Sequence, residues 1–146
     1  MKRGAVIAVT MAALFAAGEA AACGRPPLPP WDVLLKDTTR SAWIGRVSDV
    51  TPNRAPFRNR DFEVRQSTAI IETLEPLHGE APAVFEFVGS THVRARRNSG
   101  ALWCGPAMTL KAGDIVLIVP NEVFGAYVLK PEDSPIEIRS RLEAHR

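Results

Sequence analysis

The chain has 146 residues, of which 46% are hydrophobic and 23% are charged, and its 18 basic and 16 acidic side chains give a formal net charge of +2. This length suits one domain with a core of its own. The near balance of charge argues against an acidic solvating tail and against a nucleic-acid scavenger that works through net charge alone.

Residues 1–22 have the features of a secretory signal peptide. Lys2 and Arg3 form a positive start, residues 5–17 are apolar, and residues 20–22 are small alanines of the kind that a signal peptidase accepts. The apolar stretch is too short to span a membrane. We expect cleavage after Ala22, which leaves a single domain of residues 23–146 in the periplasm or outside the cell.

The predicted cleavage makes Cys23 the first mature residue, and Cys104 is the only other cysteine. In an oxidising compartment two cysteines most simply form one disulfide. Such a bridge would close a loop of about 80 residues, and the chain-entropy model assigns it about 4.5 kcal/mol as an upper figure. The alternative is a lipid anchor on Cys23, which would leave Cys104 unpaired and for which Ala20 fits a lipoprotein signal poorly.

The first half of the mature chain predicts two strands. Residues 24–30 are rich in proline and should run extended, and residues 31–36 form a short helix. Residues 41–50 are rich in strand formers and stop at residues 51–53. Residues 53–60 form a mobile loop, and a long strand follows at residues 62–74, with a bend or bulge near Gln66. Residues 77–79 then form a turn.

The second half predicts three shorter strands and a helix. Residues 83–88 alternate as a strand that Gly89 breaks, and residues 94–100 form a polar connection. Residues 114–119 are a central buried strand, with residues 123–129 as its hairpin partner. Ser134 begins a capping box with proline in the first helical position, and a short amphipathic helix with Ile136 or Ile138 and Leu142 on its apolar side runs to about Ala144.

Five short strands with helices near both ends predict a mainly β fold, namely a small, partly closed five-stranded barrel. The spacing of the segments does not give the order of strand pairing. A β-sandwich is the competing architecture.

Several short segments together resemble the netrin-like domain, the OB-fold of the tissue inhibitors of metalloproteinases, and particularly its bacterial versions. They are the terminal Cys23 before a proline-rich stretch, Ala-Trp-Ile-Gly-Arg-Val at 42–47, Leu-His-Gly at 77–79, Trp-Cys-Gly at 103–105 and Ile-Val-Leu-Ile-Val at 115–119. The resemblance implies a five-stranded OB-like barrel and a disulfide between Cys23 and Cys104. It covers residues 23 to about 129.

In those inhibitors the first cysteine binds the target. The resemblance implies that the free amine and the carbonyl of Cys23 would chelate the zinc of a metalloprotease, which keeps an open coordination position. Gly24 and Arg25 would contact the same partner. Gly24 stands where the inhibitors have Ser or Thr, and Arg25 replaces their second cysteine, so both positions depart from the inhibitor pattern.

Two groups of arginines allow another function. They could bind an anionic oligosaccharide or nucleic acid across an OB face, or they could simply lie in solvated loops. No regular aromatic interleaving accompanies them, which disfavours nucleic acid. The two groups are Arg54, Arg58, Arg60 and Arg65, and Arg94, Arg96 and Arg97.

The sequence shows no motif for catalysis or for a resident metal or cofactor. His78, His92 and His145 lack the spacing of a metal site, and no nucleophile elbow or phosphate-cradling loop is present. We therefore expect no enzyme and no cofactor. The prediction is an exported protein-interaction module, with metalloprotease inhibition as its sharpest form and a ligand-binding OB domain as the alternative.

Overall fold

The computed structural model describes residues 36, 39–97, 100–121 and 125–146. The predicted signal peptide, the proline-rich segment and the predicted helix at 31–36 lie outside these residues, except for Lys36. Cys23, Gly24 and Arg25 also lie outside them. In the part of the chain that the structure describes, no helix is long and apolar enough to cross a membrane.

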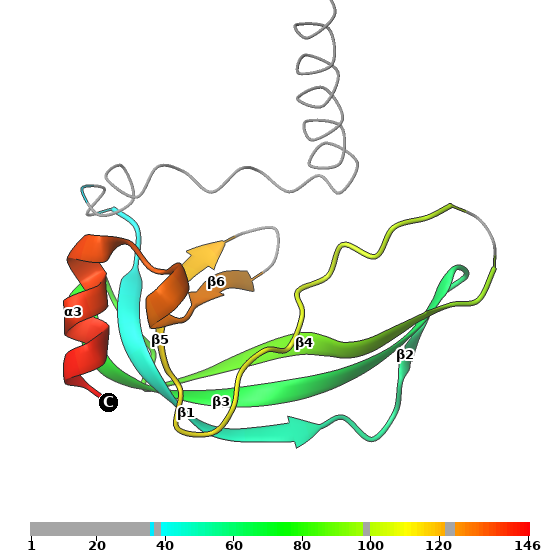
Figure 1. The fold of residues 1–146 in the computed structure, drawn as a ribbon, viewed down its shortest axis with the longest axis horizontal. Helices are drawn as coiled ribbons and strands as arrows, with labels where there is room; N and C mark the ends of the chain where they lie inside the picture. The colour runs from blue at the N-terminus through cyan, green and yellow to red at the C-terminus, as the bar shows by residue number, and fades with distance from the viewer. Residues whose placement is uncertain (1–35, 37–38, 98–99, 122–124) are drawn as a thin grey trace, which may run out of the picture.

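The described chain is mainly β and ends in a short helix (Figure 1). Its strands are β1 (Ala42–Pro52), β2 (Phe57–Arg58), β3 (Phe62–His78), β4 (Val84–Ala95), β5 (Ile115–Asn121) and β6 (Gly125–Leu129). A 3-10 turn, η1 (Pro131–Asp133), precedes the helix α3 (Ile136–Ala144).

All strand pairs are antiparallel, and the long strands follow one another in the order β4–β3–β1–β5–β6. The two-residue strand β2 pairs with the beginning of β3. The mainly β prediction is confirmed. The described sheet is open, because β4 stands at one side of this order and β6 at the other with no pairing between them, so closure into the predicted five-stranded barrel is not seen.

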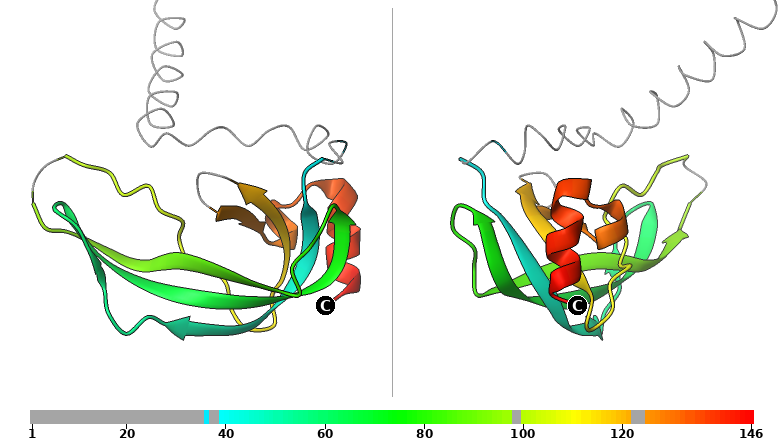
Figure 2. Two further views of the ribbon diagram at one scale, coloured as in Figure 1. Left: turned by 180° about the vertical axis from the view of Figure 1, so that it is seen from behind. Right: turned by 60° about the vertical axis from the view of Figure 1, so that its left-hand side comes forward.

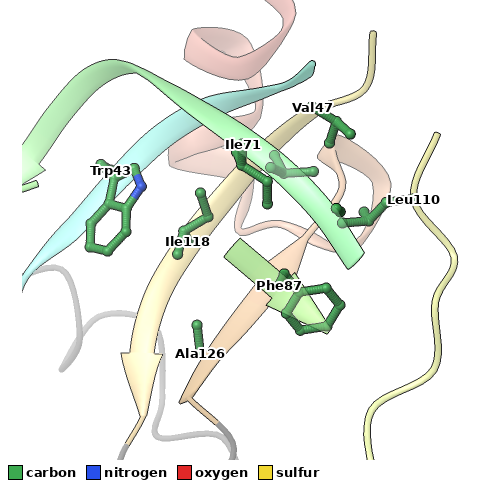
Figure 3. Close-up of a cluster of buried hydrophobic side chains, with 9 residues drawn as sticks. Trp43, Val47, Ile71, Phe87, Leu110, Ile118 and Ala126 are labelled. Atoms are coloured by element: carbon green, nitrogen blue, oxygen red, sulfur yellow. The ribbon is translucent and has the colours of Figure 1, made fainter. Parts of the chain in front are cut away.

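The sheet carries a hydrophobic cluster on each face. The first, called the inner cluster, joins all five long strands, including the two outermost strands of the pairing order (Figure 3). Its buried members are Trp43, Val47, Ala69, Ile71, Phe87, Leu110, Val116, Ile118 and Ala126. A sheet whose outermost strands contribute to one cluster must be strongly curved, and the inner cluster lies on its concave side.

The second cluster packs the opposite face of the sheet against α3 (Figure 2). Its buried members are Ala42, Ile44, Ile115, Leu117, Val119, Ile138 and Leu142. β5 supplies side chains to both clusters, which is why residues 115–119 are an unbroken apolar run, as a strand buried on both faces requires. The prediction of a central buried strand there is confirmed.

Gly45 of β1 faces the inner cluster and makes room for it. A Cβ atom at this position would lie 2.6 Å from Ile71 Cγ2 and 3.1 Å from Ile118 Cδ1. The absent side chain therefore lets β3 and β5 pack closely on both sides of β1.

The predicted end of the strand at residues 83–88 is wrong. Gly89 does not break the strand, and β4 continues to Ala95. Ser90 explains the continuation, because its amide donates to the Pro106 carbonyl (2.7 Å) and its carbonyl accepts from the Met108 amide (2.9 Å). A later segment of the chain thus supports the strand at the residue after the glycine.

The predicted capping box is also wrong. The helix begins at Ile136 with Pro135 as its N-cap and without a side-chain cap, while the Ser134 hydroxyl donates to the Lys130 carbonyl at 2.6 Å. Ser134 therefore closes the preceding 3-10 turn instead of the helix. Of the two isoleucines proposed for the apolar side, Ile138 is buried and Ile136 is 74% exposed.

The end of α3 is fastened to β3 and β1 by polar contacts. The Glu75 carboxylate pairs with Arg141 and with His145 Nε2, the latter at 2.9 Å, and Arg46 donates to the His145 carbonyl at 3.1 Å. The hydrogen bonds from His145 and Arg141 lower the pKa of Glu75 below its usual value.

Candidate cationic binding face

The end of the sheet opposite α3 forms a projection, here called the arm (Figures 1 and 2). It consists of β2, residues 62–66 of β3 and residues 91–95 of β4. The rest of the described molecule, with both hydrophobic clusters and α3, is called the body. β3 and β4 run through both regions.

The strand register gathers cationic side chains on one face of the arm. Glu63 of β3 lies opposite Arg58 of β2 on one side and opposite Arg94 of β4 on the other. The neighbouring pair on the same face is Arg65 with His92. Directly opposed residues point to the same face of a sheet, and so do residues two apart along a strand, so these five side chains share a face, the cationic face.

The two arginine groups of the sequence therefore meet in space. Residues 54–60 lie before β3 and residues 94–97 lie at the end of β4, more than 30 positions later in the chain. Antiparallel pairing of β3 with β4 brings Arg94 directly beside the β2–β3 hairpin. The exposed Arg54, Arg60 and Arg97 lie in the adjoining loops.

An irregularity in the ladder marks the start of the arm. The pairing of β3 with β4 shifts between Arg65 and Gln66, so that Gln66 faces Ser90 while Arg65 faces His92 and Thr91 is left over. The sequence predicted a bend or bulge near Gln66, and the irregularity lies there, but its extra residue belongs to β4 and not to the predicted strand. An extra residue reverses which side chains of β4 face each side, and this reversal puts His92 and Arg94 on the same face as Arg65.

Backbone contacts hold the tip of the arm in shape. The Arg96 guanidinium donates to the Asn59 carbonyl (2.8 Å), and its amide donates to the Asp61 carbonyl (2.7 Å). The Asn59 side chain accepts from the amides of Asp61 and Phe62 at 2.9 and 2.7 Å. The sequence predicted a mobile loop here and gave no sign of β2. The local Asn59 contacts order the turn, and the contacts from Arg96, 37 positions after Asn59, could not be read from the local sequence.

The opposite face of the arm is aromatic. Phe57 lies opposite Val64, and Phe62 and Val64 are buried. The Trp103 ring lies 5.9 Å from the Phe57 ring and 5.8 Å from the Phe62 ring, and its Nε1 donates to the Ser90 hydroxyl at 3.3 Å. Trp103 thus covers this face of the arm, and it is called the Trp103 clamp below.

Gly105 makes room for the Trp103 ring, and Gly89 makes room for the backbone of residues 107–108. A Cβ atom on Gly105 would lie 2.6 Å from the Trp103 ring, and one on Gly89 would lie 2.8 Å from the Met108 amide nitrogen. Both positions need glycine because another part of the chain fills the space of a side chain. The Trp-Cys-Gly segment therefore has a packing role in this fold.

The structure leaves the predicted zinc- and partner-binding residues untested. Cys23, Gly24 and Arg25 lie outside the described residues, and Cys104 follows the Trp103 clamp and is not a free thiol. The Cys23–Cys104 bridge stays a prediction. Within residues 39–97, 100–121 and 125–146, no group of three or more His, Cys, Asp or Glu side chains could hold a metal ion.

Comparison with known proteins identifies no relative: no family model, no curated protein and no solved structure matches this chain. The netrin-like resemblance therefore stays a prediction.

Proposed function

We propose that this protein is an exported, non-enzymatic binding module that holds an anionic oligosaccharide on the cationic face of the arm. The observation that supports this proposal is the strand register, which sets Arg58, Arg65 and Arg94 on one face. All three arginines are exposed. A surface of this kind attracts anions and positions several cations for simultaneous contact.

The proposal uses arginine chemistry. A guanidinium group is planar, stays charged and offers paired N–H donors that fit carboxylate, sulfate and phosphate groups. On one face of a strand, residues two apart are separated by about 7 Å, and neighbouring strands are about 5 Å apart. The face therefore offers a grid of cations to a ligand with repeated negative groups.

The sheet order supports an OB-like barrel as the scaffold. Numbered along the chain without β2, the five long strands pair in the order 3-2-1-4-5, and the outermost strands share the inner cluster through Phe87 and Ala126. We infer a partly open barrel. OB-folds bind oligonucleotides and oligosaccharides on the face of strands 2 and 3 and with the loop between strands 1 and 2, which here correspond to β3, β4 and residues 53–61.

The arrangement of aromatic rings favours a glycan over nucleic acid. Proteins that bind single strands combine a cationic groove with aromatic rings on which the bases stack. Here Phe57, Phe62 and Trp103 belong to the opposite face of the arm. Bases of a bound strand would therefore have no ring to stack on beside Arg65 and Arg94.

Salt-dependent retention on immobilised heparin tests the proposal. The double variant Arg65→Ala/Arg94→Ala should lose about tenfold in affinity, and the slope of log K against log salt should fall by about 2, one for each lost ion contact. The matched control is Lys111→Ala/Arg146→Ala, which removes the same charge away from the arm. An equal loss of heparin affinity in both double variants would show that only net charge matters, which would contradict the proposal.

A nucleic-acid ligand would give a different result. Tighter binding of single-stranded DNA than of an abasic strand of the same length would mean that the bases are recognised. We expect equal binding of the two strands.

A second candidate function is protein binding through the N-terminus of the mature chain. In this case the Cys23 amine and carbonyl bind the zinc of a metalloprotease, and Gly24 and Arg25 flank the contact. Its support is the netrin-like resemblance together with the absence of a free thiol at Cys104, which suits a bridge to Cys23.

Blocking the amine tests this second candidate function. An added Ala before Cys23 should abolish inhibition of a susceptible metalloprotease and leave the thermal midpoint nearly unchanged, whereas Gly24→Thr should strengthen inhibition by filling the specificity pocket. Inhibition that survives the added residue would rule out zinc binding by Cys23. Intact-mass analysis checks the same terminus, with a disulfide and no acyl chain as the expected result.

A further inference from the structure

Glu63 occupies the centre of the cationic face. It lies between Arg58 and Arg94 in the row that crosses β2, β3 and β4. Among the paired residues of the described arm it is the only acidic side chain. A carboxylate here lowers the attraction of the face for any anion. Positive charge alone therefore does not explain why an acidic side chain stands at this position.

The contacts of Glu63 leave part of its carboxylate available. Its Oε2 accepts from Arg58 Nε at 2.8 Å, and its side chain is 27% exposed. A carboxylate has two oxygens with two lone pairs each, so a single hydrogen bond from Arg58 leaves several acceptor sites unused. Glu63 can therefore accept a further hydrogen bond from a ligand.

Across β2, β3 and β4, the row presents a cation (Arg58), a hydrogen-bond acceptor (Glu63) and a second cation (Arg94). Its two arginines are two strand spacings apart, about 10 Å. An acidic glycan presents the complementary pattern, because hydroxyl groups lie between its successive anionic groups. A polyphosphate presents anions with no donor between them.

We propose that Glu63 is a specificity-determining residue that accepts a hydrogen bond from a ligand hydroxyl while Arg58 and Arg94 bind the flanking anionic groups. This inference rests on the proposed function of the face. It assigns the ligand to glycans in which carboxylates or sulfates alternate with free hydroxyls. The same carboxylate repels polyphosphates and other anions that lack donors.

The test compares two ligands whose affinities should change in opposite directions. Wild-type protein and Glu63→Ala are titrated with a hexamer of galacturonate and with linear polyphosphate of matched charge. Affinity for the uronate should fall about five- to tenfold, because a charge-assisted hydrogen bond is lost. Affinity for polyphosphate should rise about threefold, because a repulsion across about 7 Å of solvated surface is removed.

Two further variants complete the experiment. Glu63→Gln keeps an accepting oxygen without the charge, so it should retain most uronate affinity and gain polyphosphate affinity. Glu86→Ala removes an exposed carboxylate from β4 in the body and should change neither affinity. Thermal midpoints check that each variant is folded.

The outcomes separate this inference from the proposed function. A rise in affinity for both ligands in Glu63→Ala would show that Glu63 only weakens anion binding, which overturns the inference while the cationic face stands. An unchanged uronate affinity would overturn it as well. Failure of the wild-type protein to bind either ligand or heparin would overturn the proposed function itself.

Discussion

The body and the arm are built from the same two strands, yet they differ in what their side chains do. In the body, β3 and β4 place Ala69, Ile71 and Phe87 into the inner cluster. In the arm, the same strands carry Arg65 and Arg94 into solvent. The difference arises because β1, β5, β6 and α3 cover the body and end before the arm. The two strands that continue into the arm therefore keep one face exposed to solvent.

The two regions also differ in how they are stabilised. The body relies on hydrophobic burial on both faces of β5, whereas the arm has one covered face, closed by the single Trp103 clamp. We therefore expect core substitutions to act on the whole molecule and clamp substitutions to act on the arm. The following predictions test this division.

The largest expected effect is in the inner cluster. Ile118→Ala should lower the free energy of unfolding by about 3 kcal/mol, because Ile118 is fully buried and the neighbours on β1 and β3 cannot close the cavity. The matched arm variant is Val93→Ala, whose side chain is 37% exposed and which should cost less than about 1 kcal/mol. Urea unfolding measures both, and equal losses would contradict the division.

A smaller and more local effect is expected at the clamp. Trp103→Ala removes the ring contacts with Phe57 and Phe62 and the hydrogen bond to Ser90, so it should cost about 2 kcal/mol. Amides of residues 91–95 should then lose hydrogen-exchange protection through local opening, beyond the loss seen in β5. Trp103→Phe, which keeps an aromatic ring, should have a stability between those of the wild type and Trp103→Ala. A uniform loss of protection over β4 and β5 would mean that the arm does not open separately.

The smallest effect concerns the contacts that fasten α3 to the body. Because the pKa of Glu75 is lowered in the folded protein, its contribution is present above the unfolded pKa and is lost as the pH falls through the folded pKa. Glu75→Gln should therefore cost about 0.5 to 1 kcal/mol at pH 7 and almost nothing near pH 2. Urea unfolding at both pH values checks this, and Glu86→Ala should show no such difference. A larger cost in acid than at pH 7 would contradict the assignment.

Local patterns in the sequence were enough to predict most of the body. The run at residues 115–119 indicated a buried central strand, the strand formers at 41–50 indicated β1, and the apolar spacing indicated a helix with Leu142 inside. Such patterns report burial, and burial in the body follows the period of each element. The capping box at Ser134 failed because a nearby carbonyl, that of Lys130, competes successfully for the hydroxyl.

The arm shows what only the tertiary structure decided. The sequence displayed two groups of arginines and a Trp-Cys-Gly segment, but it did not show that antiparallel pairing would bring Arg58 and Arg94 to either side of Glu63. It also indicated that Gly89 would end a strand, since local propensity carries no information about the Pro106 and Met108 partners of Ser90. Residue types and their periods fixed which segments could be strands and which were basic. Register, a bulge and a clamp from distant residues decided which side chains share a face, because these depend on contacts between segments far apart in the chain.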